Sequence, residues 1–272
     1  MPREINKDTL LCMSLAGRPG NFGTRFHNYL YNELNLNIVY KAFTTNDLQA
    51  AIGGVRALGI RGCAVSMPFK EACIPFMDEM DESASVIQSV NTIVNTDGRL
   101  RAYNTDYIAI AQLLDTYQVS RDSVFALRGS GGMAKAVASA VRDAGFRTGY
   151  IIARNETAGR ELAQACDYEW KSEVSGIEPE LIINVTPIGM AGGPESEELA
   201  FAPEVIDKVE TVFDVGAIPS ETPLIRYART KEKKVITGAE VIALQALEQF
   251  VLYTGVRPED ELVQRAAEHA RS

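Results

Sequence analysis

The chain has 272 residues, of which 46% are hydrophobic and 23% are charged, and its formal net charge is -9. This length favours two domains, and the composition is typical of a globular protein with sizeable cores. No apolar run approaches the roughly 20 residues of a membrane helix, and no basic segment followed by an apolar one opens the chain. The longest basic run, 231–234, is short and interrupted, which predicts a solvated turn. We therefore expect a cytoplasmic protein without a signal peptide, a membrane partner or a nucleic-acid partner.

Four cysteines and two histidines limit the chemistry that the chain can support. No C-x-x-C pair occurs and three of the cysteines sit among apolar residues, which is typical of small buried side chains and not of a disulfide frame or a zinc site. A Ser-His-Asp triad or a histidine-based metal site has little to build with. His269 lies in a polar tail, and His27 could act alone. The cysteines are Cys12, Cys63, Cys73 and Cys166.

Short apolar runs alternate with amphipathic stretches in the first hundred residues, as in α/β proteins. The pair Asp97-Gly98 lies between two apolar runs and is a strong signal for a two-residue hairpin. The expected elements, in chain order, are a strand at Leu10–Leu15, a helix at Phe26–Leu34, a strand at Ile38–Ala42, a helix at Asp47–Leu58, a strand at Gly62–Ser66, a helix after Pro68, and hairpin strands at Val90–Asn95 and Leu100–Tyr103.

The rest of the chain alternates strands and helices more regularly, which predicts right-handed crossovers and a parallel sheet. We predict two α/β domains: residues 1–103, and a nucleotide-binding unit at 104–237, with the helical segment 238–272 packing back on the first domain. The expected elements are helices at Tyr107–Tyr117, Met133–Ala144, Ala158–Ala165 and Gly238–Tyr253, and strands at Val124–Leu127, Gly149–Ala153, Leu181–Asn184 and Val212–Val215.

A glycine-rich loop follows the strand at Val124–Leu127 and opens an alanine-rich helix. Gly129, Gly131 and Ala134 fit G-x-G-x-x-[GA], in which the small residues allow a tight turn, close approach to a pyrophosphate and close packing of helix on strand. Free N–H groups at the start of the helix would hold the phosphates. The strand before and the helix after favour a Rossmann-type cofactor site over a plain tight turn. The residues of this site are Gly129, Ser130, Gly131, Gly132, Met133 and Ala134.

The end of the next strand indicates which dinucleotide binds. An acidic residue there would bond the ribose 2′-hydroxyl of NAD, whereas Arg154 is placed to meet the 2′-phosphate of NADP, whose geometry suits a guanidinium. Glu156 would favour NAD if it faced the ribose. The strand-end position of Arg154 favours NADP, although a plain surface charge is the alternative.

Lys70 and Asp106 are a chemically sensible pair for reduction of a carbonyl. Lys70 follows the buried strand at Gly62–Ser66, and Asp106 lies at the start of the helix at Tyr107–Tyr117. A lysine can give the proton that accompanies a hydride, and a carboxylate can orient it. Without further information, Asp106 could simply cap its helix and Lys70 could be solvated.

Eight segments, all in the same order, resemble motifs of the shikimate dehydrogenase family, and the resemblance runs from about residue 13 to residue 257. The glycine loop 129–134 and Asn104-Thr105-Asp106 are two of them, and the latter is identical to the family's N-T-D. The others are Ser66–Lys70, similar to V-T-x-P-x-K; Ser89–Ile93, to A-V-N-T-I; Arg154-Asn155, to the N-R-T clamp; Asn184–Met190, to N-x-T-S-x-G-M; Asp214–Pro223, to D-x-x-Y-x-P-x-x-T-P; and Gly238–Gln245, to G-x-x-M-L-x-x-Q.

The resemblance implies a reaction and a role for each matching residue. The family interconverts 3-dehydroshikimate and shikimate with NADPH, a step of aromatic amino acid biosynthesis. Lys70 and Asp106 match its catalytic pair, while Ser66, Asn91 and Gln245 match residues that bond the ring hydroxyls. The residues that match the cofactor neighbourhood outside the glycine loop are Arg154, Asn155, Thr186, Val215 and Gly238.

The chain departs from the family where the family's serines hold the substrate carboxylate. The segment 17–28 is about two residues shorter and lacks both serines, so Thr24, Asn21 or Arg25 would take over the carboxylate. The family tyrosine of D-x-x-Y is Ala217. The third position of the NADP clamp is Ala158, with Arg160 close by. The pattern is most similar to the divergent shikimate dehydrogenase-like branch.

We therefore expect an NADP-dependent dehydrogenase of shikimate or a near relative, as a monomer or homodimer. Two alternatives remain open. The enzyme could act on quinate or an amino-substituted shikimate, or the protein could be a nucleotide-binding sensor with little catalysis.

Overall fold

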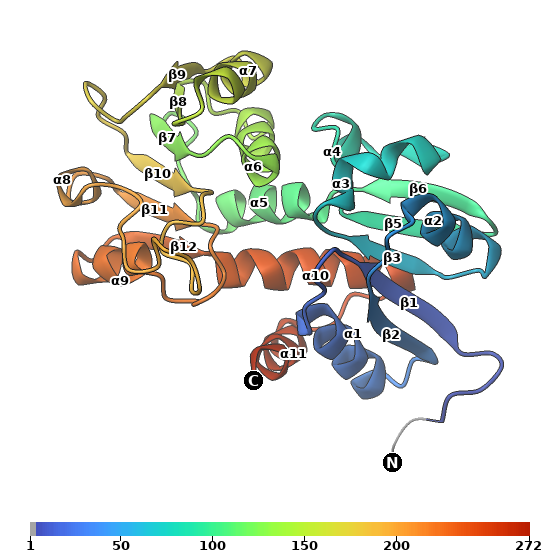
Figure 1. The fold of residues 1–272 in the computed structure, drawn as a ribbon. Helices are drawn as coiled ribbons and strands as arrows, with labels where there is room; N and C mark the ends of the chain where they lie inside the picture. Colours follow the sequence, from blue (N-terminus) through green and yellow to red (C-terminus); the bar gives the residue numbers. More distant parts are fainter. Residues whose placement is uncertain (1–3) are drawn as a thin grey trace. The chain divides into compact units, whose positions relative to one another are not determined.

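The computed structural model describes residues 4–272 as two compact units. The first unit contains residues up to 105 and residues 243–272, and the second contains residues 106–242. Figure 1 shows that each is built on its own sheet, with helices around it. Among residues 4–272, no helix has the length and apolarity to cross a bilayer. The predicted two-domain α/β fold is confirmed.

The sheet of the first unit is mixed, with strand order β2-β1-β3-β5-β6-β4. Strand β1 pairs in parallel with β2 and β3, while β5 is antiparallel to β3 and to β6. Asp97 and Gly98 both have positive φ angles, 52° and 85°, which is the conformation that a tight two-residue hairpin requires. The predicted hairpin is confirmed. The strands are β1 Leu10–Leu15, β2 Ile38–Phe43, β3 Gly62–Val65, β4 Glu79–Met80, β5 Thr92–Thr96 and β6 Arg99–Tyr103.

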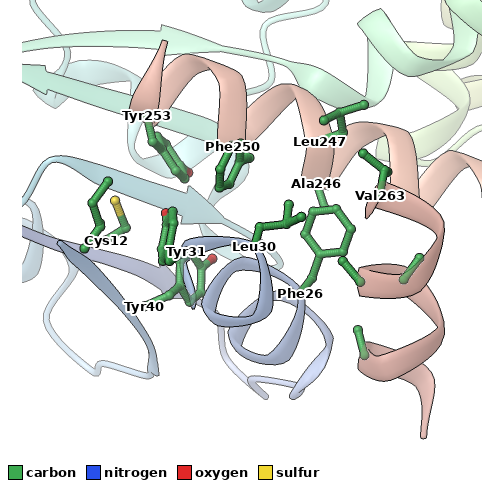
Figure 2. Packing of buried hydrophobic residues seen from close by; sticks show 14 of the residues in the cluster. Cys12, Phe26, Leu30, Tyr31, Tyr40, Ala246, Leu247, Phe250, Tyr253 and Val263 are labelled. Carbon is green, nitrogen blue, oxygen red and sulfur yellow. The ribbon is translucent and has the colours of Figure 1, made fainter. Parts of the chain in front are cut away.

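Helices on the two faces of this sheet close two apolar clusters. In one of them the second half of α10 and α11 pack against α1, and Figure 2 shows Phe250 of α10 pointing toward Leu30 of α1. The sequence therefore returns to its first unit after the second is complete. The helices are α1 Phe22–Glu33, α2 Leu48–Ala57, α3 Phe69–Ala72, α4 Glu82–Ser85, α10 Gly238–Thr254 and α11 Asp260–Arg271, with a 3₁₀ turn at Ile74–Phe76.

The sheet of the second unit is parallel throughout, with strand order β12-β11-β10-β7-β8-β9. This is the doubly wound order, in which the chain starts in the middle, at β7, and reverses direction between β7 and β10. Ligands of such sheets bind at the carboxyl ends of the strands beside that reversal. The strands are β7 Phe125–Arg128, β8 Gly149–Ile152, β9 Glu169–Lys171, β10 Leu181–Asn184, β11 Thr211–Asp214 and β12 Lys234–Thr237, and the helices are α5 Thr105–Thr116, α6 Gly132–Asp143, α7 Glu156–Cys166, α8 Pro203–Ile206 and α9 Pro223–Thr230.

The unit boundaries differ from those drawn on the sequence by two and five residues. Asn104 and Thr105 lie in the first unit because they are bonded to Ser89 and Asn91. Residues 238–242 lie in the second unit. Glu240, in the first turn of α10, is bonded there to Thr237 and Tyr117.

The sequence-based prediction missed some elements and misplaced the ends of others, because their sequence signals are short or weak. The expected turn at 231–234 is wrong at its last residue, since Lys234 begins β12. Helix α1 begins at Phe22, four residues before the predicted start at Phe26. Helix α11 buries alanines and one valine, which make a weaker apolar signal than leucines. The elements not predicted are β4, α4, β9, α8, α9, β12 and α11, together with the 3₁₀ turn at Ile74–Phe76.

Candidate active site

The glycine loop joins β7 to α6 and leaves room for an anion. Gly129 has φ +131°, and a Cβ there would lie 2.7 Å from Cγ2 of Val185. A Cβ at Gly131 or Gly132 would meet nothing within 4 Å, so this side of the loop is open. No side chain caps the start of α6, and its first N–H groups and positive dipole end are therefore available to phosphate oxygens. Ala134 is fully buried, as close packing of helix on strand requires.

Arg154 and Asn155 follow β8, the strand next to the glycine loop. Asn155 caps α7, because its Oδ1 accepts a hydrogen bond from the N–H of Ala158. The Arg154 side chain is 79% exposed and its contact with Glu195, at 3.5 Å, is long. Glu156 accepts a 2.8 Å hydrogen bond from Arg160 on the next turn of α7. The guanidinium of Arg154 is thus the more available of the two groups for a ligand.

The remaining predicted cofactor residues follow the carboxyl ends of β10, β11 and β12. Thr186 is fixed by Asn184, whose Oδ1 accepts from both the Thr186 N–H, at 3.0 Å, and its hydroxyl, at 2.7 Å. A Cβ at Gly238 would lie 2.4 Å from the carbonyl oxygens of Val215 and Gly216, so Gly238 is needed for close backbone packing. Thr186, Val215 and Gly238 therefore border one edge of the sheet with the glycine loop.

The buried carboxylate of Asp214 joins the ends of β10 and β11. It accepts hydrogen bonds from Asn184 Nδ2 at 3.0 Å, from Thr222 Oγ1 at 2.6 Å and from the Gly216 N–H at 3.0 Å. Burial raises the pKa of Asp214, and these hydrogen bonds oppose the shift. The sequence showed Asp214 only as part of a motif; the structure shows it as an anchor for the loops that carry Thr186 and Val215.

In the first unit, Asn91 connects the segments that carry the predicted catalytic residues. Its Oδ1 accepts from the Thr105 N–H, at 2.8 Å, and from the Thr105 hydroxyl, at 3.2 Å. The N–H of the preceding residue, Val90, donates to the backbone oxygen of Lys70 at 2.9 Å. Asp106 follows Thr105 directly and is 6% exposed. We call this group of hydrogen-bonded residues, Val90, Asn91 and Thr105, the Asn91 corner. It fixes the backbone at Lys70 and the start of α5, the helix that carries Asp106.

Two glutamines of α10 lie at this corner. The Thr105 hydroxyl donates to Gln245 Oε1 at 3.4 Å. Gln249, one turn later, is buried, and its Nε2 donates to the Thr92 hydroxyl at 3.0 Å and to the Asn91 carbonyl at 3.3 Å. Gln249 was not predicted, although its spacing of four residues from Gln245 places both on one face of the helix.

The residues predicted around the substrate carboxylate lie at the start of α1. Asn21 precedes the helix without a side-chain capping bond, and both it and Arg25 are exposed. Oγ1 of Thr24 is buried and has no hydrogen-bond partner among residues 4–272. Ser66, just after β3, is exposed. Thr24 is therefore the one of these side chains with a buried oxygen still to be satisfied.

His27 is not available for catalysis. It is fully buried and stacked on Tyr40, with ring centroids 4.5 Å apart. Burial lowers the pKa of His27 to about 3. The four cysteines are buried free thiols, as predicted, and burial raises the pKa of Cys12 to about 11. Within residues 4–272, no three His, Cys, Asp or Glu side chains are grouped so as to hold a metal ion.

Comparison with known proteins identifies the family. The family model described as "Shikimate dehydrogenase substrate binding domain" matches residues 22–93. A shikimate dehydrogenase-like protein of Haemophilus influenzae is 57% identical over 268 residues, which are 98% of this chain and 99% of the relative. The chain belongs to the shikimate dehydrogenase family.

Other members of the shikimate dehydrogenase family carry cofactor and substrate in their names. The shikimate dehydrogenase (NADP(+)) of Desulforamulus reducens is 31% identical over 273 residues, 93% of this chain and 92% of the relative. The Thermus thermophilus shikimate 5-dehydrogenase, solved with NADP(H) and shikimate, has a TM-score of 0.85 and 27% identity, covering 96% of this chain and 99% of its own. The predicted family, a family of oxidoreductases, is confirmed, including the similarity to a dehydrogenase-like member.

Proposed function

We propose that the protein interconverts shikimate and 3-dehydroshikimate with NADP as the hydride carrier, a step of aromatic amino acid synthesis. In this proposal the second unit, residues 106–242, holds the cofactor, and the first unit, residues up to 105 with residues 243–272, holds the substrate. The observation that carries the proposal is the Asn91 corner, which binds the backbone of Lys70 through Val90 and the start of α5 through Thr105. The family's catalytic lysine and aspartate match the residues at this corner.

The second unit fits NADP. The open side of the glycine loop and the uncapped start of α6 suit the pyrophosphate, and Arg154 suits the 2′-phosphate. When bound, NADP would accept the hydride in the oxidation of the hydroxyl and give it back in the reduction. A preference for NAD would require an acidic residue that faces the ribose, and Glu156 instead accepts a hydrogen bond from Arg160.

Lys70 and Asp106 carry out the proton transfer in this mechanism. As the hydride leaves the ring carbon, the hydroxyl proton passes to Lys70, and in the reverse direction Lys70 returns it to the carbonyl oxygen. Asp106 orients the lysine amine. Since Asn91 Oδ1 already accepts bonds from Thr105, its Nδ2 is the group that would reach a ring hydroxyl, together with Ser66 and Gln245.

Which ring acid the enzyme prefers depends on how the substrate carboxylate is bound. With both family serines absent, Thr24, Asn21 and Arg25 are the candidates, and the unsatisfied Oγ1 of Thr24 favours it. A weaker grip on the carboxylate favours a second candidate function, a dehydrogenase of quinate or of an amino-substituted shikimate. Values of kcat/KM over a panel of these acids, with a preference for one of them over shikimate, would establish it.

The test of the reaction uses Lys70→Ala, with Lys41→Ala as a matched control on the edge strand β2. Purified proteins are mixed with NADP⁺ and shikimate, and reduced nicotinamide is followed by its absorbance. We expect Lys70→Ala to lose at least ~10²-fold in turnover with unchanged NADP⁺ binding, and Lys41→Ala to behave like the parent. Near-normal turnover of Lys70→Ala would end the assignment. A parent that binds NADP⁺ but converts none of the ring acids is a nucleotide-binding sensor.

A further inference from the structure

A second arginine, Arg128, lies beside the predicted cofactor site and outside the motifs that the chain shares with its family. It is the last residue of β7 and directly precedes Gly129. In the pairing of β7 with β8 it lies opposite Ile152, two residues before Arg154. Two arginines therefore lie at or just after the carboxyl ends of neighbouring parallel strands.

The surroundings of Arg128 provide no counter-charge. Its guanidinium lies 5.2 Å from the ring centroid of Phe201, and its Nε is buried without a hydrogen-bond partner among residues 4–272. No carboxylate of that same range forms an ion pair with it. Burial lowers the pKa of Arg128, and the charge of Arg154 nearby lowers it further. A half-buried cation next to a second cation is unfavourable unless an anion binds between them.

The location distinguishes between the phosphates of a dinucleotide. The pyrophosphate is served by the backbone N–H groups at the start of α6, which need no arginine. Arg128 instead ends the strand beside β8, and Arg154 follows the end of β8, where the adenosine ribose of a dinucleotide lies in a doubly wound sheet. A phosphate monoester carries a charge of about -1.5 to -2 near neutral pH, which two guanidinium groups match.

We infer that Arg128 and Arg154 together bind the 2′-phosphate of NADP, and that Arg128 is a residue that selects NADP over NAD. This inference rests on the proposed use of NADP. On binding, the phosphate would replace the long contact of Arg154 with Glu195 and would satisfy the buried Nε of Arg128, which the ring of Phe201 holds in place.

Calorimetric titration of the full chain tests this without any turnover. The ligands are NADP⁺, NAD⁺, 2′,5′-ADP and 5′-AMP, and the proteins are the parent, Arg128→Leu and Arg128→Lys. The matched control is Arg147→Leu, which removes an exposed arginine at the opposite, amino-terminal end of β8. We expect Arg128→Leu to bind NADP⁺ and 2′,5′-ADP roughly 10- to 100-fold more weakly, since bonds to charged groups are the strong ones.

The other titrations decide between explanations. NAD⁺ and 5′-AMP should bind Arg128→Leu as they bind the parent, Arg128→Lys should recover part of the loss, and Arg147→Leu should lose nothing. An equal loss for NAD⁺ and NADP⁺ would overturn the inference, because it would indicate a pyrophosphate contact or a damaged fold. Unchanged NADP⁺ affinity in Arg128→Leu would overturn it as well.

The same data separate the inference from the proposed reaction. If the parent binds neither dinucleotide, both fail. If the parent prefers NADP⁺ through Arg128 but oxidises no ring acid, the inference stands and the proposed reaction fails. If the parent oxidises shikimate with NADP⁺, and Arg128→Leu still prefers NADP⁺ over NAD⁺ as strongly as the parent does, only the inference fails.

Discussion

The two units differ in the kind of group that would bind an anion: the cofactor phosphates in the second unit and the substrate carboxylate in the first. In the second unit the phosphates would be held by backbone N–H groups at the start of α6, and the sequence needs only glycines to expose them. In the first unit the carboxylate of the proposed substrate would be held by side chains at the start of α1, where the family's serines are absent. A backbone site survives changes of sequence that alter a side-chain site. The cofactor is therefore easier to infer for this chain than the ring acid.

The largest effect on activity is expected from a change in the proposed catalytic pair, Lys70 and Asp106. Asp106→Asn keeps the shape of a side chain that is 6% exposed but removes the charge that would orient Lys70. We expect kcat to fall by ~10²-fold while the dissociation constant for NADP⁺ stays within twofold. Steady-state kinetics and a binding titration measure the two quantities. Asp122→Asn, an exposed aspartate before β7, is the control, and equal activity of both variants would exclude Asp106 from the proton transfer.

The backbone site can be broken in two distinguishable ways. Gly129→Ala would place a Cβ 2.7 Å from Val185 at a φ of +131°, so we expect a loss of about 1–3 kcal/mol in the free energy of unfolding as well as weaker NADP⁺ binding. Gly131→Ala meets no atom within 4 Å and has φ -83°, so the fold should keep its stability. Its methyl group would still obstruct the pyrophosphate.

Urea unfolding and calorimetry on both glycine variants separate the two effects. The expected result is that both bind NADP⁺ at least ~10-fold more weakly, while only Gly129→Ala unfolds at lower urea. Normal NADP⁺ binding by Gly131→Ala would mean that the cofactor does not approach the loop here.

The first unit carries a different vulnerability, to acid. His27 has a pKa near its usual 6.5 in the unfolded chain and about 3 in the folded chain, because burial disfavours its charged form among the rings of Tyr31, Tyr40 and Tyr253. Between these two pKa values the unfolded chain binds more protons than the folded chain. The contribution of His27 to the free energy of unfolding is therefore fully present above pH 6.5 and is lost as the pH falls toward 3. The contribution is about 1.4 kcal/mol for each pH unit.

His27→Phe should remove this dependence. We expect the parent's free energy of unfolding to fall between pH 6.5 and 4.5 by roughly 2–3 kcal/mol more than that of the variant, as measured by urea unfolding at each pH. His269→Gln changes the only other histidine, which is exposed, and should keep the parent's slope. Parallel curves for the parent and His27→Phe would show that His27 titrates normally.

Local signals explain which parts of the fold and site could be predicted. The glycine loop, the Asp97-Gly98 hairpin and the strand–helix alternation depend on neighbouring residues, and the sequence contains them whole. The Asn91 corner could not be predicted, because Thr105, Gln245 and Gln249 reach it from segments up to 158 residues apart. Arg128 was missed for a related reason: only the pairing of β7 with β8 brings it close to Arg154.

The smallest effect is expected at Glu156, the one acidic group that could reverse the preference for NADP. Its bond to Arg160 joins two side chains that are each 61% exposed, and such a pair contributes only about 0.3–0.5 kcal/mol. Glu156→Gln should therefore change NAD⁺ affinity less than twofold, with Glu161→Gln on the same helix as the control. A tenfold loss of NAD⁺ binding confined to Glu156→Gln would instead show that this carboxylate holds the ribose hydroxyls. In that case the end of β8 would be built for NAD, and Arg128 and Arg154 would require another anion.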